Sequence, residues 1–113
     1  MSEASSPVVR TATAEWKPST VPGVAVKVLR RDETTGESTS LVRFAAGARF
    51  PAHNHPAGEE IFVLEGDFQV GRHRLVGGDY LYTPPHERHA ASSERGCLVL
   101  VTLPRPVEIL ETE

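Results

Sequence analysis

The stretch that decides the fold reads Gly47-Ala-Arg-Phe-Pro-Ala-His53-Asn-His55-Pro-Ala-Gly-Glu59-Glu-Ile-Phe-Val-Leu-Glu-Gly66. Residues two apart in a β-strand point to the same face, so His53 and His55 are predicted to project together. Glu59 shares its parity with Ile61, which predicts that its carboxylate faces the interior while Glu60 faces outward. Two imidazoles and a carboxylate are ligands that divalent transition metals accept.

A second bend that carries a histidine follows, and it reads Gly78-Asp-Tyr-Leu-Tyr-Thr-Pro84-Pro-His-Glu-Arg-His89. The glycine opens a turn, the prolines bend the chain, and His89 starts a new strand from which its ring can point toward the first cluster. Three imidazoles and one carboxylate leave room for water or substrate, and they suit Fe(II), Zn(II), Mn(II) or Ni(II). We predict one divalent ion bound by His53, His55, Glu59 and His89.

The remainder of the chain predicts an all-β fold. Nine glycines and nine prolines interrupt the 113 residues, and apolar residues nowhere recur at the helical spacing of three and four. Many short strands at such spacing indicate a sandwich or barrel. We expect a flexible tail at residues 1–9 and a single barrel domain at residues 10–113. The predicted strands include Val24–Arg30, Ser38–Phe44, Glu60–Glu65, Phe68–Val70, His73–Val76, Asp79–Tyr82, His89–Ser92, Cys97–Thr102 and a last one at Val107–Leu110.

The two clusters resemble the two motifs of the cupin superfamily. The first matches Gly-x5-His-x-His-x3-Glu-x6-Gly at every defined position. The second resembles Gly-x5-Pro-x-Gly-x2-His-x3-Asn, with His86 in place of the internal glycine and Ser93 in place of the asparagine. This resemblance implies a cupin double-stranded β-helix, or jelly-roll barrel, with a metal ion inside the barrel mouth.

A finer resemblance rests on three segments: Gly-Glu-Glu-Ile-Phe-Val-Leu-Glu-Gly-Asp-Phe at 58–68, Tyr-Leu-x-x-Pro-Pro at 80–85 and Ser-x-x-Gly-Cys at 93–97. These look like the cupin domain of ChrR-type anti-sigma factors and like acetylacetone-dioxygenase-type cupins. ChrR-type proteins carry an additional N-terminal zinc-binding domain that holds the sigma factor. The chain has no room for that domain, so sigma-factor binding is not expected of this chain alone. The segment at 69–73 also departs from the acidic sequence of that subfamily.

Three functions remain open at this point. The first is an Fe(II)-dependent dioxygenase of an enolisable small molecule such as a β-diketone, with Glu59 as the catalytic base if the metal releases it. Its pocket would be lined by Phe50, Ile61, Val63, Leu81 and Leu98. The second is a non-catalytic zinc-binding sensor or binding module, which the ChrR resemblance implies. The third is a metal-dependent sugar-phosphate isomerase, which needs a cationic clamp such as Arg43, Arg49 and Arg88.

Several single residues have simpler interpretations. His86 and His73 are expected in exposed turns, and Cys97 is expected to be a small buried hydrophobe rather than a nucleophile. Tyr80 and Tyr82 share a strand face and are expected to pack on the sheet. The strand at Glu60–Glu65 is apolar on both faces, so its outer face needs cover from the N-terminal strand or from a second subunit, and we predict a homodimer.

Composition limits the partners. The net charge is −3 and the 12 Lys and Arg are scattered, which argues against nucleic acid and against a membrane surface. One cysteine allows no intrachain disulfide, and the polar N-terminus lacks an apolar signal segment. These features predict a cytoplasmic location.

Overall fold

The structure is a computed structural model that describes residues 6–106 and 108–109. The predicted tail lies partly outside this range, because only residues 6–9 of it are described; these are exposed coil. The strands are β1 (Lys17–Pro18), β2 (Val24–Arg31), β3 (Ser38–Phe44), β4 (Arg49–Asn54), β5 (Glu59–Val70), β6 (His73–Val76), β7 (Tyr80–Thr83), β8 (Arg88–Ser92), β9 (Cys97–Leu103) and β10 (Glu108–Ile109). Positions 107 and 110 of the predicted last strand lie outside the described residues.

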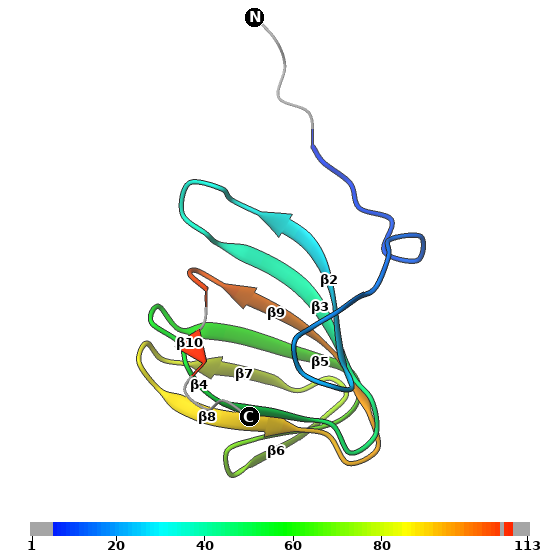
Figure 1. Cartoon of the computed structure of the whole chain (residues 1–113), viewed down its shortest axis with the longest axis vertical. Helices are drawn as coiled ribbons and strands as arrows, with labels where there is room; N and C mark the ends of the chain where they lie inside the picture. Colours follow the sequence, from blue (N-terminus) through cyan, green and yellow to red (C-terminus); the bar gives the residue numbers. More distant parts are fainter. Residues whose placement is uncertain (1–5, 107, 110–113) are drawn as a thin grey trace, which may run out of the picture.

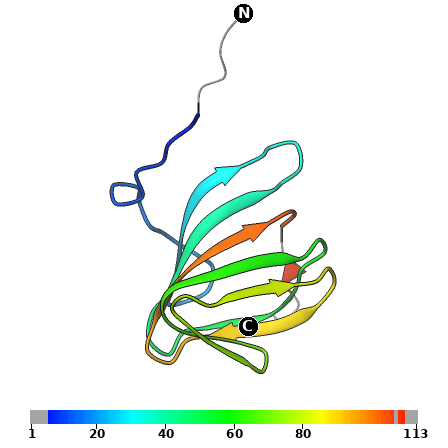
Figure 2. The same ribbon diagram turned by 180° about the vertical axis from the view of Figure 1, so that it is seen from behind.

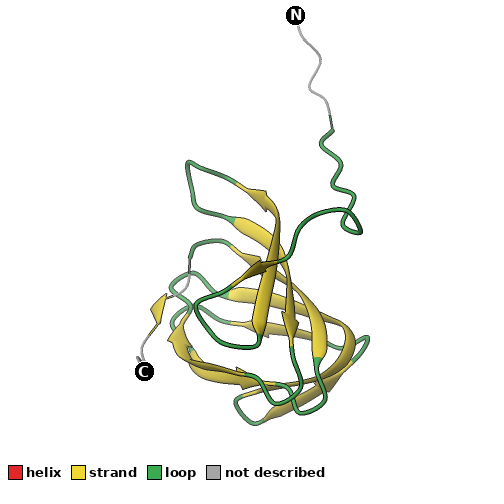
Figure 3. Cartoon of the chain, turned by 45° about the vertical axis from the view of Figure 1, so that its right-hand side comes forward, coloured by secondary structure: helices red, strands yellow, loops and turns green. Residues whose placement is uncertain are grey.

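All strand pairs are antiparallel, in the order β1-β2-β3-β9-β5-β8-β4-β10. The first half of the long β5 pairs with β7 and β9, and its second half pairs with β6 and β8. This strand therefore joins two sheets that curl around one interior, as Figures 1 and 2 show from opposite sides. The described residues contain strands and loops but no helix (Figure 3), which confirms the predicted all-β fold.

The interior is filled by alternate residues of the facing strands. On β9, Cys97, Val99 and Val101 are buried, whereas Leu98 and Leu100 on the opposite face are partly exposed. Phe44 and Phe68 meet edge to face with ring centroids 5.2 Å apart, a geometry that aromatic pairs favour. The core thus follows the period of two that a half-buried strand imposes.

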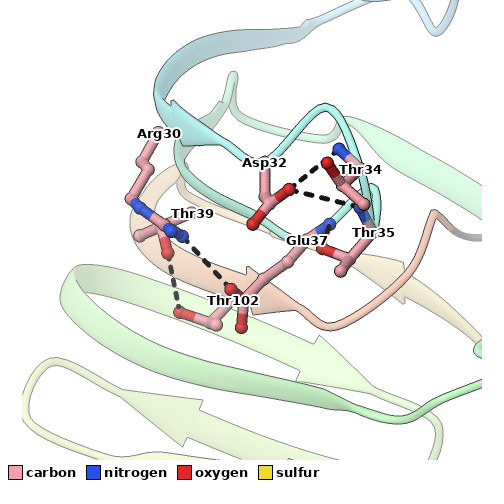
Figure 4. Close-up of polar contacts among 7 residues, drawn as sticks. All are labelled: Arg30, Asp32, Thr34, Thr35, Glu37, Thr39 and Thr102. Atoms are coloured by element: carbon pink, nitrogen blue, oxygen red, sulfur yellow. Dashed lines mark hydrogen bonds and ion pairs between the residues drawn. The ribbon is translucent and has the colours of Figure 1, made fainter.

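The hairpin between β2 and β3 forms part of the rim of the barrel (Figure 4). The Asp32 carboxylate accepts hydrogen bonds from the backbone N–H groups of Thr34 and Thr35 at 2.8 and 3.2 Å, and these bonds lower the pKa of Asp32. Arg30 pairs with Glu37 across the hairpin at 3.1 Å. The rim is therefore held in one conformation by local polar contacts.

The outer face of β2 and β3 is partly covered by the segment that precedes β2. The ring of Trp16 lies under two cations, with the Lys27 ammonium 4.7 Å and the Arg43 guanidinium 4.2 Å from its centroid. Lys27 also donates a hydrogen bond to the carbonyl of Thr11. Within the described part of the chain, no helix has the length and hydropathy needed to cross a membrane.

Candidate metal centre

Three neighbouring strands bring the four predicted ligands together. His53 lies on β4 directly opposite His89 on β8, His55 follows the end of β4, and Glu59 is the first residue of β5. One ligand atom from each of the four residues lies within 4.8 Å of every other. His53, His55 and Glu59 are buried, and the His89 side chain is only 7% exposed. Two distant sequence motifs thus converge on one point.

Two positive-φ positions shape the loops around His55. Gly58 has φ +88° and its N–H donates to the His55 carbonyl at 3.2 Å. His86 has φ 69°, and its N–H donates to the same carbonyl at 2.7 Å. Glycine adopts a positive φ at no steric cost, which explains why the cupin motif has glycine at the position of His86. The His86 side chain is exposed, as expected.

Backbone carbonyls orient two of the imidazoles. Nδ1 of His53 lies 2.8 Å from the Pro51 carbonyl oxygen, and Nδ1 of His55 lies 3.4 Å from the Glu87 carbonyl oxygen. A ring that donates from Nδ1 keeps the lone pair of Nε2 for a metal ion, and such outer contacts hold ligating histidines in place. These two carbonyls could not be predicted from the sequence, because a backbone acceptor has no residue signature.

The donor atoms fit a divalent cation. Nε2 of His55 lies 3.0 Å from Oε1 of Glu59, yet both atoms are buried without an aligned hydrogen bond. A buried polar atom left without a partner costs about 1–3 kcal/mol. The ligand atoms of the four side chains surround a common point, which is the arrangement found around a bound metal ion. Imidazole and carboxylate together suit a borderline divalent ion.

Burial and mutual charge set the ionisation of the cluster. Burial raises the pKa of Glu59, but the neighbouring His55 and His89 outweigh it, so the pKa lies below its usual value. Burial also lowers the pKa of His53. Burial acts in the same direction on His55, but its contacts with Glu59 and Glu87 prevail and raise its pKa. A carboxylate that stays ionised and a neutral His53 are the forms that bind metal.

A cavity of about 330 Å³ opens beside the cluster and is lined in part by His53, Glu59 and His89. Of the five predicted pocket residues, Phe50 and Ile61 line it. Val63 and Leu81 do not line the cavity but pack in or against the core. Leu98 does not line this cavity, because it lies on the opposite face of β9 from the buried Cys97 and Val99. The remaining apolar lining residues include Val24, Val26, Val28, Val42, Phe44, Phe68, Val70, Ala91, Val99, Val101 and Leu103.

The other singled-out residues lie away from the cavity. Cys97 is buried, and burial raises the pKa of its thiol, which disfavours the nucleophilic thiolate. His73 is exposed. Tyr80 and Tyr82 are 55% and 54% exposed on the outer surface, and the Tyr80 hydroxyl donates to Glu60 at 2.7 Å. The three arginines considered as a phosphate clamp, Arg43, Arg49 and Arg88, do not line the cavity.

Comparisons with known proteins identify a relative in sequence and structures with a similar fold. DNA damage-repair/toleration protein DRT102 of Arabidopsis thaliana is 37% identical over 75 residues, which cover 61% of this chain but only 23% of that protein. A Methylibium petroleiphilum PM1 protein with the provisional name acetylacetone dioxygenase has a similar structure: the TM-score is 0.89 at 20% identity, over 98% of this chain and 85% of that one.

A second similar structure comes from the complex of Rhodobacter sphaeroides SigE with the anti-sigma ChrR. Its TM-score is 0.71 at 24% identity, over 83% of this chain and 50% of that one. The profile of the ChrR cupin-like domain family matches residues 4–105, which is nearly the whole chain. The chain therefore belongs to the ChrR cupin-like domain family.

Proposed function

We propose that this protein is a metal-dependent cupin enzyme, an Fe(II) dioxygenase of an enolisable small molecule such as a β-diketone. The observation that carries the proposal is that three of the four predicted ligands line an otherwise largely apolar cavity. A substrate in that cavity lies beside the ion and away from bulk water. Similarity to a protein provisionally named acetylacetone dioxygenase supports this choice of substrate class.

His53, His55, Glu59 and His89 would hold the ion. When bound, Fe(II) supplies a Lewis acid and reactivity toward O2. The apolar walls exclude water and so strengthen the electrostatic interactions within the site. Glu59 is the one carboxylate among the described residues that line the cavity. Its carboxylate, when released from the ion, is therefore the base placed to take the acidic proton of a diketone held there.

The test is O2 uptake by Fe(II)-loaded protein with a panel of β-diketones that differ in their substituents. We expect substrate-dependent consumption of O2, with the same protein loaded with Zn(II) as the matched control that consumes none. Metal content is measured on the same samples. One Fe(II) per chain without O2 uptake for any diketone would contradict the enzymatic proposal.

A non-catalytic metal-binding module is the second candidate, and a specific observation favours it. Among the described cavity-lining residues, His53, Glu59 and His89 are the only histidines and carboxylates, and all three are predicted ligands, so no separate acid or base is left for catalysis. The chain also belongs to the ChrR cupin-like family. One Zn(II) per chain that resists chelators, in protein that shows no turnover, would favour this module.

The proposal includes a homodimer formed through the outer face of β5 and β7. Phe62, Leu64, Tyr80 and Tyr82 are between 39% and 55% exposed there, and Phe62 lies directly opposite Tyr80. A second copy would bring the same apolar patch, and isologous contacts of this kind are the commonest in homodimers. We expect Phe62→Glu to convert a dimer to a monomer in light scattering, while Val76→Glu, on exposed β6, leaves the mass unchanged. A monomeric mass for the unmodified chain would refute the dimer.

A further inference from the structure

We propose that ligands of this metal centre carry an extended apolar substituent that passes between Val26 and Val42, and that Phe44 limits its length. This inference rests on the proposed metal-bound ligand but not on catalysis. The observation behind it is that the lining of the cavity continues past the metal ligands along β3 to Phe44. A centre that chelated only a very small molecule would leave most of this volume without an occupant.

Strand register gives the direction and length of the cavity. Ser38, Ser40, Val42 and Phe44 of β3 all line it, a distance of six residues, or roughly 20 Å along a strand at about 3.4 Å per residue. The metal ligands lie toward one end of this path. Glu60 pairs with Thr102 of β9, and Thr102 pairs with Thr39 of β3. Glu59 is therefore nearly level with Ser38, whereas Phe44 lies at the far end.

The chemical character of the wall changes along the same path. Near the ligands the wall includes Ser38, Ser40 and the guanidinium-bearing Arg31. Beyond Ser40 the cavity-lining residues of β2, β3 and β9 are Val26, Val42, Val99, Val24 and Phe44, which are all apolar. A ligand that binds the ion with polar oxygens therefore binds most tightly if its apolar part points toward Phe44 rather than toward the rim.

The walls of the deep part do not collapse around it. Val42 pairs with Val99 and with Val26 across neighbouring strands, so the three side chains form one row across the sheet. In the next row of the sheet, two residues further along β3, the ring of Phe44 spans the interior and contacts Phe68. The shorter valine side chains do not span it. The row of valines thus leaves the space open, and the aromatic pair closes it.

Straight-chain alkyl hydroxamic acids test the proposal, because they chelate metals through two oxygens and differ only in chain length. Their affinity for Zn(II)-loaded protein is measured by calorimetry, with metal-free protein as the reference. We expect each added methylene to tighten binding about fourfold, from about 0.8 kcal/mol per buried CH2. The gain should stop near ten carbons, because the four residue steps from Ser40 to Phe44 leave roughly 13 Å of strand beyond the ligands at about 3.4 Å per residue.

Val42→Phe should shorten the compartment. We expect it to weaken binding of the decyl compound at least about tenfold, since two or more methylenes lose their place, while acetohydroxamate binds as before. Val76→Phe is the matched control, because Val76 is 59% exposed and lies outside the cavity. Val26→Phe, on the strand nearer the sheet edge, serves if Val42→Phe does not fold.

The outcomes separate this inference from the proposed enzyme. Length-dependent hydroxamate binding without O2 uptake supports the compartment and contradicts the dioxygenase. O2 uptake with affinity that does not depend on chain length contradicts the compartment alone. Equal weakening of short and long hydroxamates by Val42→Phe also overturns it, and protein that binds neither metal nor hydroxamate overturns both.

Discussion

His89→Ala is expected to purify with almost no bound metal, whereas the unmodified chain is expected to carry one divalent ion. The imidazole of His89 comes from the second motif, and the other three ligands come from the first. Its loss leaves His53, His55 and Glu59 around a gap that faces the cavity. Removal of an outer hydrogen bond to a metal ligand already costs about 10–100-fold in affinity, so the loss of a ligand should exceed about 100-fold. Metal content is measured by mass spectrometry, and metal affinity is measured by competition with a chelator.

Two other histidines provide the controls. His73→Ala removes an exposed imidazole on β6 and should leave the metal content at one per chain. His86→Gly removes the imidazole of the bend while it favours the positive φ of that position, so it isolates the His86 side chain from its backbone. Stoichiometric metal in His89→Ala, with unchanged affinity, would show that the fourth ligand is a different residue. Equal metal loss in His86→Gly would give the bend histidine a role that its exposure does not suggest.

Strand parity explains why the cluster was predictable from sequence. The order His-x-His and the shared parity of Glu59 with Ile61 place these side chains inside, and the structure buries His53, His55 and Glu59 while Glu60 stays exposed. The second motif was predictable for a different reason: Pro84 and Pro85 bend the chain before His89 starts a new strand. Both patterns are local, so each can be read from a short stretch of sequence.

The pocket was less predictable because several strands are apolar at every position. Cys97-Leu-Val-Leu-Val101 has no polar residue to mark its outer face, so periodicity could not exclude Leu98. Bulges add to this difficulty. The register shifts between Phe50 and His53 on β4, and both residues line the cavity although they are an odd number of positions apart. Only the paired strands decide which side chains of such a segment face inward.

Gly66→Ala is expected to lose about 2–6 kcal/mol of folding free energy, by addition of backbone strain and steric overlap. Gly66 ends the first motif with φ +89°, a conformation that alanine adopts only under strain. A Cβ there would lie 2.2 Å from the Gly96 carbonyl oxygen and 2.7 Å from Cα of Cys97. Both are backbone atoms, so no side-chain rotation relieves the overlap. The total free energy of unfolding of such a domain is about 5–15 kcal/mol. The loss should therefore be visible as a large shift of the urea midpoint of unfolding.

Gly78→Ala separates the two causes. Gly78 has φ +96°, but a Cβ there meets nothing within 4 Å, so this variant carries the strain without the overlap and should lose about 1–3 kcal/mol. The difference between the two variants then measures the contact between β5 and the start of β9. Equal midpoints would show that the Gly96–Cys97 turn moves aside at little cost. A larger loss in Gly66→Ala would mean that the glycine closing the first motif is required because two backbones meet there, while the metal ligands lie at the opposite end of the first half of β5.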